Sequence, residues 1–82
     1  KIKIKIITIL SDHNDHTPSE IASIINSNNN TILNNCLFLE FLDILNIEEK
    51  ETLRTVYYIK LNENPMTKEI IRRIREMDDI KM

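Results

Sequence analysis

The sequence predicts an α+β fold that is mostly helical, with three helices, a two-stranded hairpin and a further helix. Two observations lead to this prediction. Between residues 17 and 45, a strong helix start is followed by a polar break and then by a second helical segment. Residues 47–51 and 55–61 then read as two short strands joined by a brief link. The predicted order is therefore helix, turn, helix and hairpin.

Length and composition limit the number of domains and the classes of partner that this chain can have. The 82 residues suffice for one domain, expected over residues 1–82 with a core at about 4–61 and a last helix at about 65–78. The net charge of −2 argues against indiscriminate nucleic-acid binding but allows a local basic surface. The single cysteine and the lack of a leader-like segment favour the cytoplasm. We expect no membrane span, since no apolar run approaches about 18 residues.

The first ten residues can be interpreted in two ways. Lysine and isoleucine alternate at the start, which is typical of a strand. Ile6, Ile7 and Leu10 also fit one face of a helix that ends near Ser11, and the polar residues 12–16 would then form a loop. The helix is the favoured interpretation, and the strand is its alternative.

The second helix has a clear start. Thr17 can accept a hydrogen bond from the amide of Glu20, whose carboxylate can reach back to the amide of Thr17. Pro18 suits the first helical position because its missing N–H has no partner there. Four apolar residues are expected on the buried side of this helix: Ile21, Ala22, Ile24 and Ile25.

The third helix is expected from about residue 30 to residue 45, after the polar break Ser27-Asn28-Asn29. Asn46 would end it in a left-handed conformation. Its second half is apolar nearly all round, so it needs cover on several sides, part of which a partner chain can supply. In the last helix, Asn64 and Pro65 form the start, and an apolar stripe follows: Met66, Ile70, Ile71, Ile74 and Met77.

Four segments carry a resemblance to a known family. Residues 6–10, the run Thr-Pro-Ser-Glu-Ile-Ala at 17–22, residues 39–47 and the run Tyr-Tyr-Ile-Lys-Leu at 57–61 occur in the order seen in winged helix-turn-helix regulators of the ArsR/MarR type. The resemblance spans about residues 4–61. It implies a winged-helix fold, a DNA-binding third helix and a hairpin wing.

The sequence also departs from that family pattern. It has no glycine in the wing, and its third helix carries no Arg, Lys or His. Metal-sensing members carry paired cysteines, whereas Cys36 stands alone, so we expect no metal and no cofactor. His13 and His16, with Asp12 and Asp15 nearby, read as a solvated loop rather than a closed set of ligands. No pattern here indicates an enzyme.

The resemblance points to sequence-specific binding of double-stranded DNA. The residues expected to face the major groove are Asn30, Thr31, Asn34 and Asn35. Asparagine can bond adenine in a bidentate manner, and a threonine methyl can contact thymine, so this face suits A·T-rich sites. The alternative is a polar face that meets only solvent.

Phosphate contacts need cations, and no Lys or Arg lies between residues 6 and 49. On the wing, the candidates are Lys50 and Arg54. Further candidates lie at the two ends of the chain: Lys1, Lys3, Lys5, Arg72, Arg73 and Arg75. The nearby carboxylates are expected to repel phosphate: Asp12, Asp15, Glu20, Glu40 and Asp43.

Weak binding by one subunit predicts a homodimer on a palindromic site. Its interface is expected on the last helix, at Met66, Ile70, Ile74 and Met77. The rival hypothesis is a winged-helix module that binds another protein and no nucleic acid, which the acidic balance and the apolar second half of the third helix favour. The position of the cations relative to Asn34 separates the two hypotheses.

Overall fold

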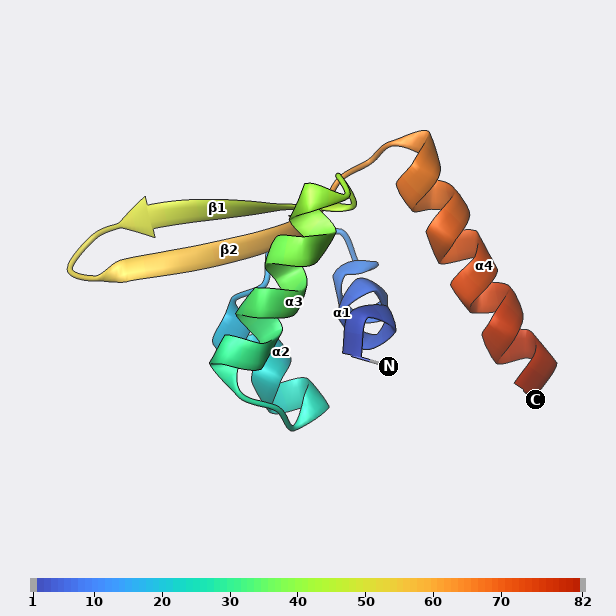
Figure 1. Cartoon of the computed structure of the whole chain (residues 1–82), viewed down its shortest axis with the longest axis horizontal. Coiled ribbons are helices and arrows are strands. Elements are labelled where there is room, and N and C mark those ends of the chain that lie inside the picture. Colours follow the sequence, from blue (N-terminus) through green and yellow to red (C-terminus); the bar gives the residue numbers. More distant parts are fainter. Residues whose placement is uncertain (1, 82) are drawn as a thin grey trace.

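The computed structural model describes residues 2–81. Figure 1 shows three helices gathered together, a hairpin that projects to one side of them, and a last helix on the other side. The elements are α1 (Ile2–Leu10), α2 (Pro18–Ile25), α3 (Asn29–Phe41), β1 (Leu45–Glu51), β2 (Thr55–Leu61) and α4 (Pro65–Lys81). This is a winged-helix fold, as the sequence predicted.

The N-terminal segment is the helix α1, so the strand alternative is wrong. Ile6 and Leu10 are fully buried, and Ile7 nearly so, because they fall on the one face of α1 that meets the core. Lys3 and Lys5 lie on the exposed side. Only a helix puts these apolar side chains on one face and buries them together. The free energy of that burial outweighs the preference for a strand that the Lys/Ile alternation suggests.

Helix α2 begins as its local signals indicate but ends at Ile25, just before the predicted polar break, and two further expectations need correction. Thr17 accepts from the amide of Glu20 at 3.2 Å, and Asn26 ends the helix with a φ of 66°. The Glu20 carboxylate accepts from His16 instead of returning to Thr17, so only half of the expected capping pair forms. Ile24 was expected to be buried but is 61% exposed, since α1 and α3 cover the side of α2 that carries Ile21.

Helix α3 ends earlier than expected. It begins after Asn28, whose side chain accepts from the amide of Thr31 at 2.8 Å, and it ends at Phe41 rather than near residue 45. Asp43, not Asn46, adopts the left-handed conformation. The amide of Ile44 then donates to the carbonyl of Leu39 at 3.0 Å, which closes a Schellman turn. This turn places Ile44 and the following residue in the core.

The hairpin is antiparallel, with its register set from Leu45 opposite Leu61 to Glu51 opposite Thr55. Strand β2 has the predicted bounds, whereas β1 starts two residues before the predicted 47 because α3 ends early. Ile59 and Leu61 are buried at the base of the hairpin. The tip is exposed and projects away from the helices (Figure 1).

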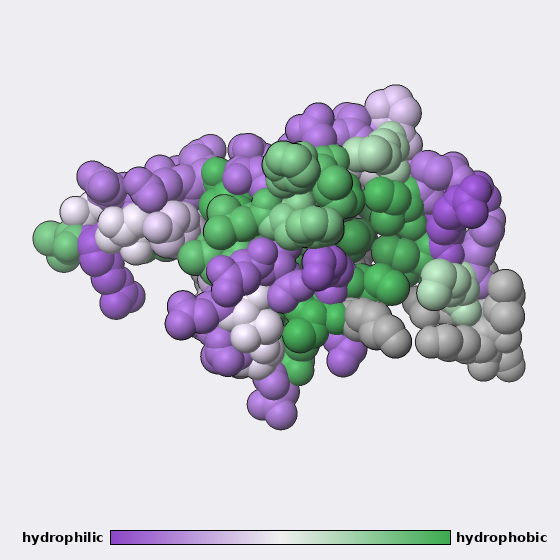
Figure 2. Space-filling model, in the orientation of Figure 1, coloured by the Kyte–Doolittle hydropathy of each residue, from purple (hydrophilic) through white to green (hydrophobic). Residues whose placement is uncertain are grey.

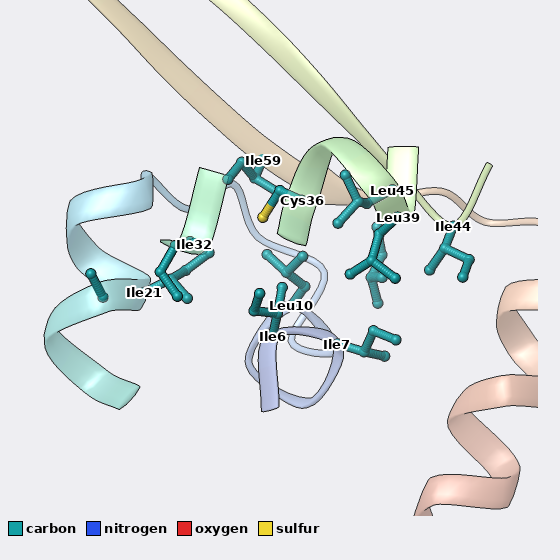
Figure 3. Packing of buried hydrophobic residues seen from close by; sticks show 12 residues of the cluster. Ile6, Ile7, Leu10, Ile21, Ile32, Cys36, Leu39, Ile44, Leu45 and Ile59 are labelled. Carbon is teal, nitrogen blue, oxygen red and sulfur yellow. The ribbon is translucent and has the colours of Figure 1, made fainter. Parts of the chain in front are cut away.

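One core joins the helices to the base of the hairpin. Figure 3 shows side chains from α1, α2, α3 and both strands pointing into it. Its fully buried members include Ile6, Leu10, Ile21, Ile32 and Ile59. Helix α4 packs on the outside of this core through half-buried isoleucines and continues to Lys81, beyond its expected end near residue 78.

Candidate nucleic-acid interface

A groove runs between the helix-turn-helix and the wing. Its volume is about 440 Å³. Its walls come from the start of α2, the start of α3 and the tip-proximal part of β2: Thr17, Pro18, Ser19, Asn29, Asn30, Leu33, Arg54, Thr55, Val56 and Tyr57. Two of the sequence-predicted site residues, Asn30 and Arg54, therefore lie in the same groove.

The start of α3 presents its polar residues unequally. Asn30 and Asn34 are exposed, whereas Thr31 and Asn35 are half-buried. The side-chain nitrogen of Asn35, Nδ2, donates to the backbone carbonyl oxygen of Thr31 at 2.7 Å. One donor of Asn35 is thus used inside the helix, and this leaves Asn30 and Asn34 as the more available pair for a ligand.

The sequence interpretation missed the role of Asn29 in building this groove. Its side-chain nitrogen donates to the hydroxyl oxygen of Ser19 at 2.8 Å, and this bond ties the first turn of α3 to the first turn of α2. A run of three asparagines contains no signal that singles out the one that faces a serine ten residues earlier. The bond fixes the wall that carries Asn30.

The two wing cations are placed differently. Arg54 is exposed at the tip and lines the groove. Lys50 lies on β1, with its Nζ 3.5 Å from a carboxylate oxygen of Glu48 and 5.1 Å from the ring centroid of Tyr58. Lys50 is therefore partly neutralised by its own strand, and of the two predicted wing cations Arg54 is the one that lines the groove with Asn30.

The DNA hypothesis expected the cations of α4 to gather around the start of α3. They do not. Helix α4 lies beyond α1 from α3 (Figure 1). Arg72 bonds Glu69 and Glu76, and the Nε of Arg73 lies 3.0 Å from a carboxylate oxygen of Glu69. Hydrogen bonds from Arg72 and then Arg73 lower the pKa of Glu69. These arginines form a salt-bridged surface of their own.

The N-terminal cations are also spread apart. Lys1 lies outside the described residues. Lys3 has its Nζ 5.2 Å from the ring centroid of Phe38, in the second half of α3, so it stands away from the groove. Arg75 lines two hollows beside α4 and not the groove. The positive charge available to the groove is therefore local and small.

Several carboxylates that were expected to repel phosphate have structural partners. A carboxylate oxygen of Glu40 accepts from the backbone amide of Ile47 at 2.9 Å and so connects α3 to β1. Asp12 and Glu20 both bind the ring of His16. Glu40 is thus turned toward the backbone of β1, and Asp12 and Glu20 share their charge with an imidazole. Both arrangements weaken the repulsion between these carboxylates and a phosphate in the groove.

His16 has two ionic partners. Burial lowers the pKa of this imidazole, but hydrogen bonds to Asp12 and Glu20 outweigh that effect, so the pKa lies above its ordinary value of 6.5. The pKa of Asp12 is lowered, first by a hydrogen bond from the backbone of Asn14 and then by His16. The loop is therefore organised around His16, while residues 12–15 are exposed to solvent, as the sequence indicated.

No metal centre is evident in residues 2–81, where no three or more His, Cys, Asp or Glu side chains are grouped to hold an ion. Cys36 is fully buried among apolar side chains, and this burial raises the pKa of its thiol to about 11. No helix in this part of the chain is long and apolar enough to cross a membrane.

An exposed apolar area covers the second half of α3. Figure 2 shows hydrophobic surface at the centre of this face, next to the hydrophilic hairpin. The exposed large apolar residues of α3 and its C-terminal cap are Leu37, Phe38, Phe41 and Leu42. On α4, Met66 and Met77 are 47% and 46% exposed, whereas Ile70 and Ile74 are half-buried against the core of the same chain.

Two solved structures are similar to this chain. Both are of the adhesin competence repressor AdcR from Streptococcus pyogenes, one of them with a C-terminal His tag. The TM-scores are 0.71 and 0.72, the sequence identity is 21% in each case, and the matches cover 99% of this chain. The chain spans only 61% and 60% of those two chains. No protein-family model matches the sequence, and no curated protein is significantly similar to it.

Proposed function

We propose that this winged-helix chain binds double-stranded DNA and regulates transcription, with the start of α3 in the major groove and the wing on the phosphate backbone. The observation that carries the proposal is the shared groove of Asn30 and Arg54. In our proposal, Asn30 reads a base and Arg54 binds a phosphate, and their position on one groove supports this division of roles. Structural similarity to a repressor supports the same function.

The chemistry of the α3 start favours A·T-rich sites. Asn30 and Asn34 are exposed and can each bond adenine N6 and N7 in a bidentate manner, and the methyl group of Thr31 can contact thymine. Ser19 adds a hydroxyl and a helix N-terminal amide on the facing wall, where helix ends favour anions. We infer that phosphate contacts are few, with Arg54 supplying the main cation and Lys50 a weaker one.

Few phosphate contacts imply weak binding by one subunit, so we propose a homodimer on two half-sites about one helical turn apart. The exposed residues Met66 and Met77 support an interface on α4. Ile70 and Ile74, which the sequence also suggested for it, contribute only the part of their surface that their own core leaves free. A non-enzymatic regulator of this kind would act in the cytoplasm.

A fluorescence titration tests the proposal. A labelled A·T-rich duplex is titrated with the protein at about 50 and 200 mM salt, with a G·C-rich duplex of equal length for comparison. We expect binding at low salt that weakens as salt rises, and tighter binding to the A·T-rich duplex. No binding to either duplex at low salt would refute a DNA-binding function.

The rival function is a protein-binding module. The apolar surface at Leu37, Phe38, Phe41 and Leu42 favours it, because exposed apolar clusters of this kind mark interaction surfaces. The two functions use different ends of α3, the first turns for DNA and the last turns for a protein partner, so substitutions separate them. Phe41→Ser should impair binding of a protein partner and leave DNA affinity within about twofold. Asn34→Ala leaves the apolar surface unaltered, so a loss of DNA binding in this variant supports the regulator.

A further inference from the structure

The side chain of His16 is held between two carboxylates. Its Nε2 lies 2.9 Å from Oδ2 of Asp12, and its Nδ1 lies 2.7 Å from Oε1 of Glu20. The side chain of His16 is 11% exposed, while those of Asp12 and Glu20 are 45% and 52% exposed. Both ring nitrogens therefore face an acceptor at hydrogen-bonding distance.

Only one protonation state satisfies both contacts. An ionised carboxylate can accept but cannot donate, and a neutral imidazole carries a single N–H. In the neutral ring, one nitrogen lone pair would face a carboxylate oxygen without a proton between them. In the imidazolium, each nitrogen donates, and both bonds are charge-assisted. The geometry at His16 is thus that of the charged ring.

The backbone of the same residue holds the wing. The amide of His16 donates to the carbonyl of Ile59 at 2.9 Å, and the amide of Ile59 donates to the carbonyl of His16 at 2.7 Å. Ile59 lies on β2 and is fully buried at the base of the hairpin. His16 therefore contacts three parts of the fold: the loop after α1 through Asp12, the first turn of α2 through Glu20, and the wing through its backbone.

We propose that His16 is a proton-operated clamp, which joins the loop after α1, the start of α2 and the base of the wing when its ring is charged, and which loosens this junction when the ring loses its proton. The start of α2 lines the groove through Thr17 and Ser19, and β2 lines it through Tyr57. Proton release at His16 would thus relax two walls of the groove from a site outside it. This effect on DNA binding rests on the proposed function, whereas the clamp itself does not.

The ionisable groups around His16 are few among residues 2–81. Asp12 faces it from the loop and Glu20 from α2, and β2 contributes the backbone of Ile59. His13, in the same loop, has its Nδ1 3.3 Å from a carboxylate oxygen of Glu63 and so belongs to a separate contact. The two carboxylates therefore determine the response of the clamp to pH.

The direction of that response follows from the two shifted groups. The raised pKa of His16 means that its contribution to stability is complete below about 6.5 and is lost as the pH rises through the raised value. The lowered pKa of Asp12 means that its contribution is present above 3.8 and is lost as the pH falls through the lowered value. The clamp is thus closed in mildly acidic solution and opens as the pH rises.

An NMR titration of the imidazole carbons in the full chain tests the clamp without DNA. We expect the pKa of His16 to exceed 6.5 and to fall in each of the isosteric variants Asp12→Asn and Glu20→Gln. A pKa at or below 6.5, or one that neither variant changes, would overturn the proposal. Because these variants keep the ring and its shape, the test does not depend on removing His16.

Unfolding in denaturant at pH 5.5 to 8.5 gives an independent readout. The wild-type chain should lose stability as the pH rises, His16→Gln should lose that dependence, and the matched variant His13→Gln should retain the part due to His16. An equal slope in wild type and His16→Gln would contradict the clamp. If the clamp is present and no duplex binds at any pH, the proposed function fails and the clamp stands.

Discussion

Asn30, in the first turn of α3, and Arg54, at the tip of the hairpin, line one groove although they are far apart in the sequence. Strand β2 passes the start of α2, where His16 and Ile59 exchange backbone hydrogen bonds, and this puts the hairpin on one side of the groove. A base-reading amide and a phosphate-binding guanidinium are thereby brought into one site. The prediction for Arg54 depends on this placement, and the prediction for Asn34 depends on the exposure of its side chain near the start of α3.

Asn34→Ala should weaken binding to an A·T-rich duplex by about 1–3 kcal/mol, because a bidentate contact to adenine would be lost. The loss should be small on G·C-rich DNA, where asparagine has no matching partner. The matched control is Asn46→Ala, at an exposed position on β1 outside the groove. Fluorescence anisotropy with both duplexes measures the effect, and equal losses in the two variants would contradict base reading by Asn34.

Arg54→Ala should weaken binding to all duplexes and reduce the slope of log affinity against log salt by about one, since one phosphate contact would be removed. Arg73→Ala provides the comparison, because Arg73 is bonded to Glu69 on α4, away from the groove. The measurement is a salt series from about 50 to 200 mM for both variants. An unchanged slope in Arg54→Ala would mean that the wing does not touch the backbone.

Light scattering should give a mass near twice the 9.7 kDa of one chain. Replacing both Met66 and Met77 by Glu should shift the protein toward monomer, because four carboxylates would then be buried at an interface between two copies. The control is Leu53→Glu at the fully exposed wing tip, which should leave the mass unchanged. A wild-type monomer at high concentration would contradict the dimer.

Cys36 should resist thiol reagents in the native state. The thiolate is the reactive form, and burial raises the pKa of this thiol to about 11, so little thiolate exists near neutral pH and the sulfur is out of reach. A colorimetric thiol assay at pH 8 should show slow labelling without denaturant and rapid, complete labelling in denaturant. Rapid labelling of the folded chain would mean that the core around α3 opens readily.

The sequence by itself determined the features that adjacent residues control. Thr17 and Pro18 start α2, Asn64 and Pro65 start α4, and the alternation after Thr55 defines β2, because caps and strand faces depend on groups only a few positions apart. The exposure of Asn30 and Asn34 followed from the same periodicity. These local rules predicted the order of helices and strands, and the resemblance to winged helix-turn-helix regulators implied the fold.

The tertiary structure decided the rest. It made residues 2–10 a helix because the core needs Ile6 and Leu10 on one side, and it ended α3 at Phe41 so that Ile44 could be buried. It also placed the α4 arginines away from the groove and brought His16 against Ile59. Burial and long-range pairing depend on which distant residues meet, and that information is absent from any short stretch of the chain.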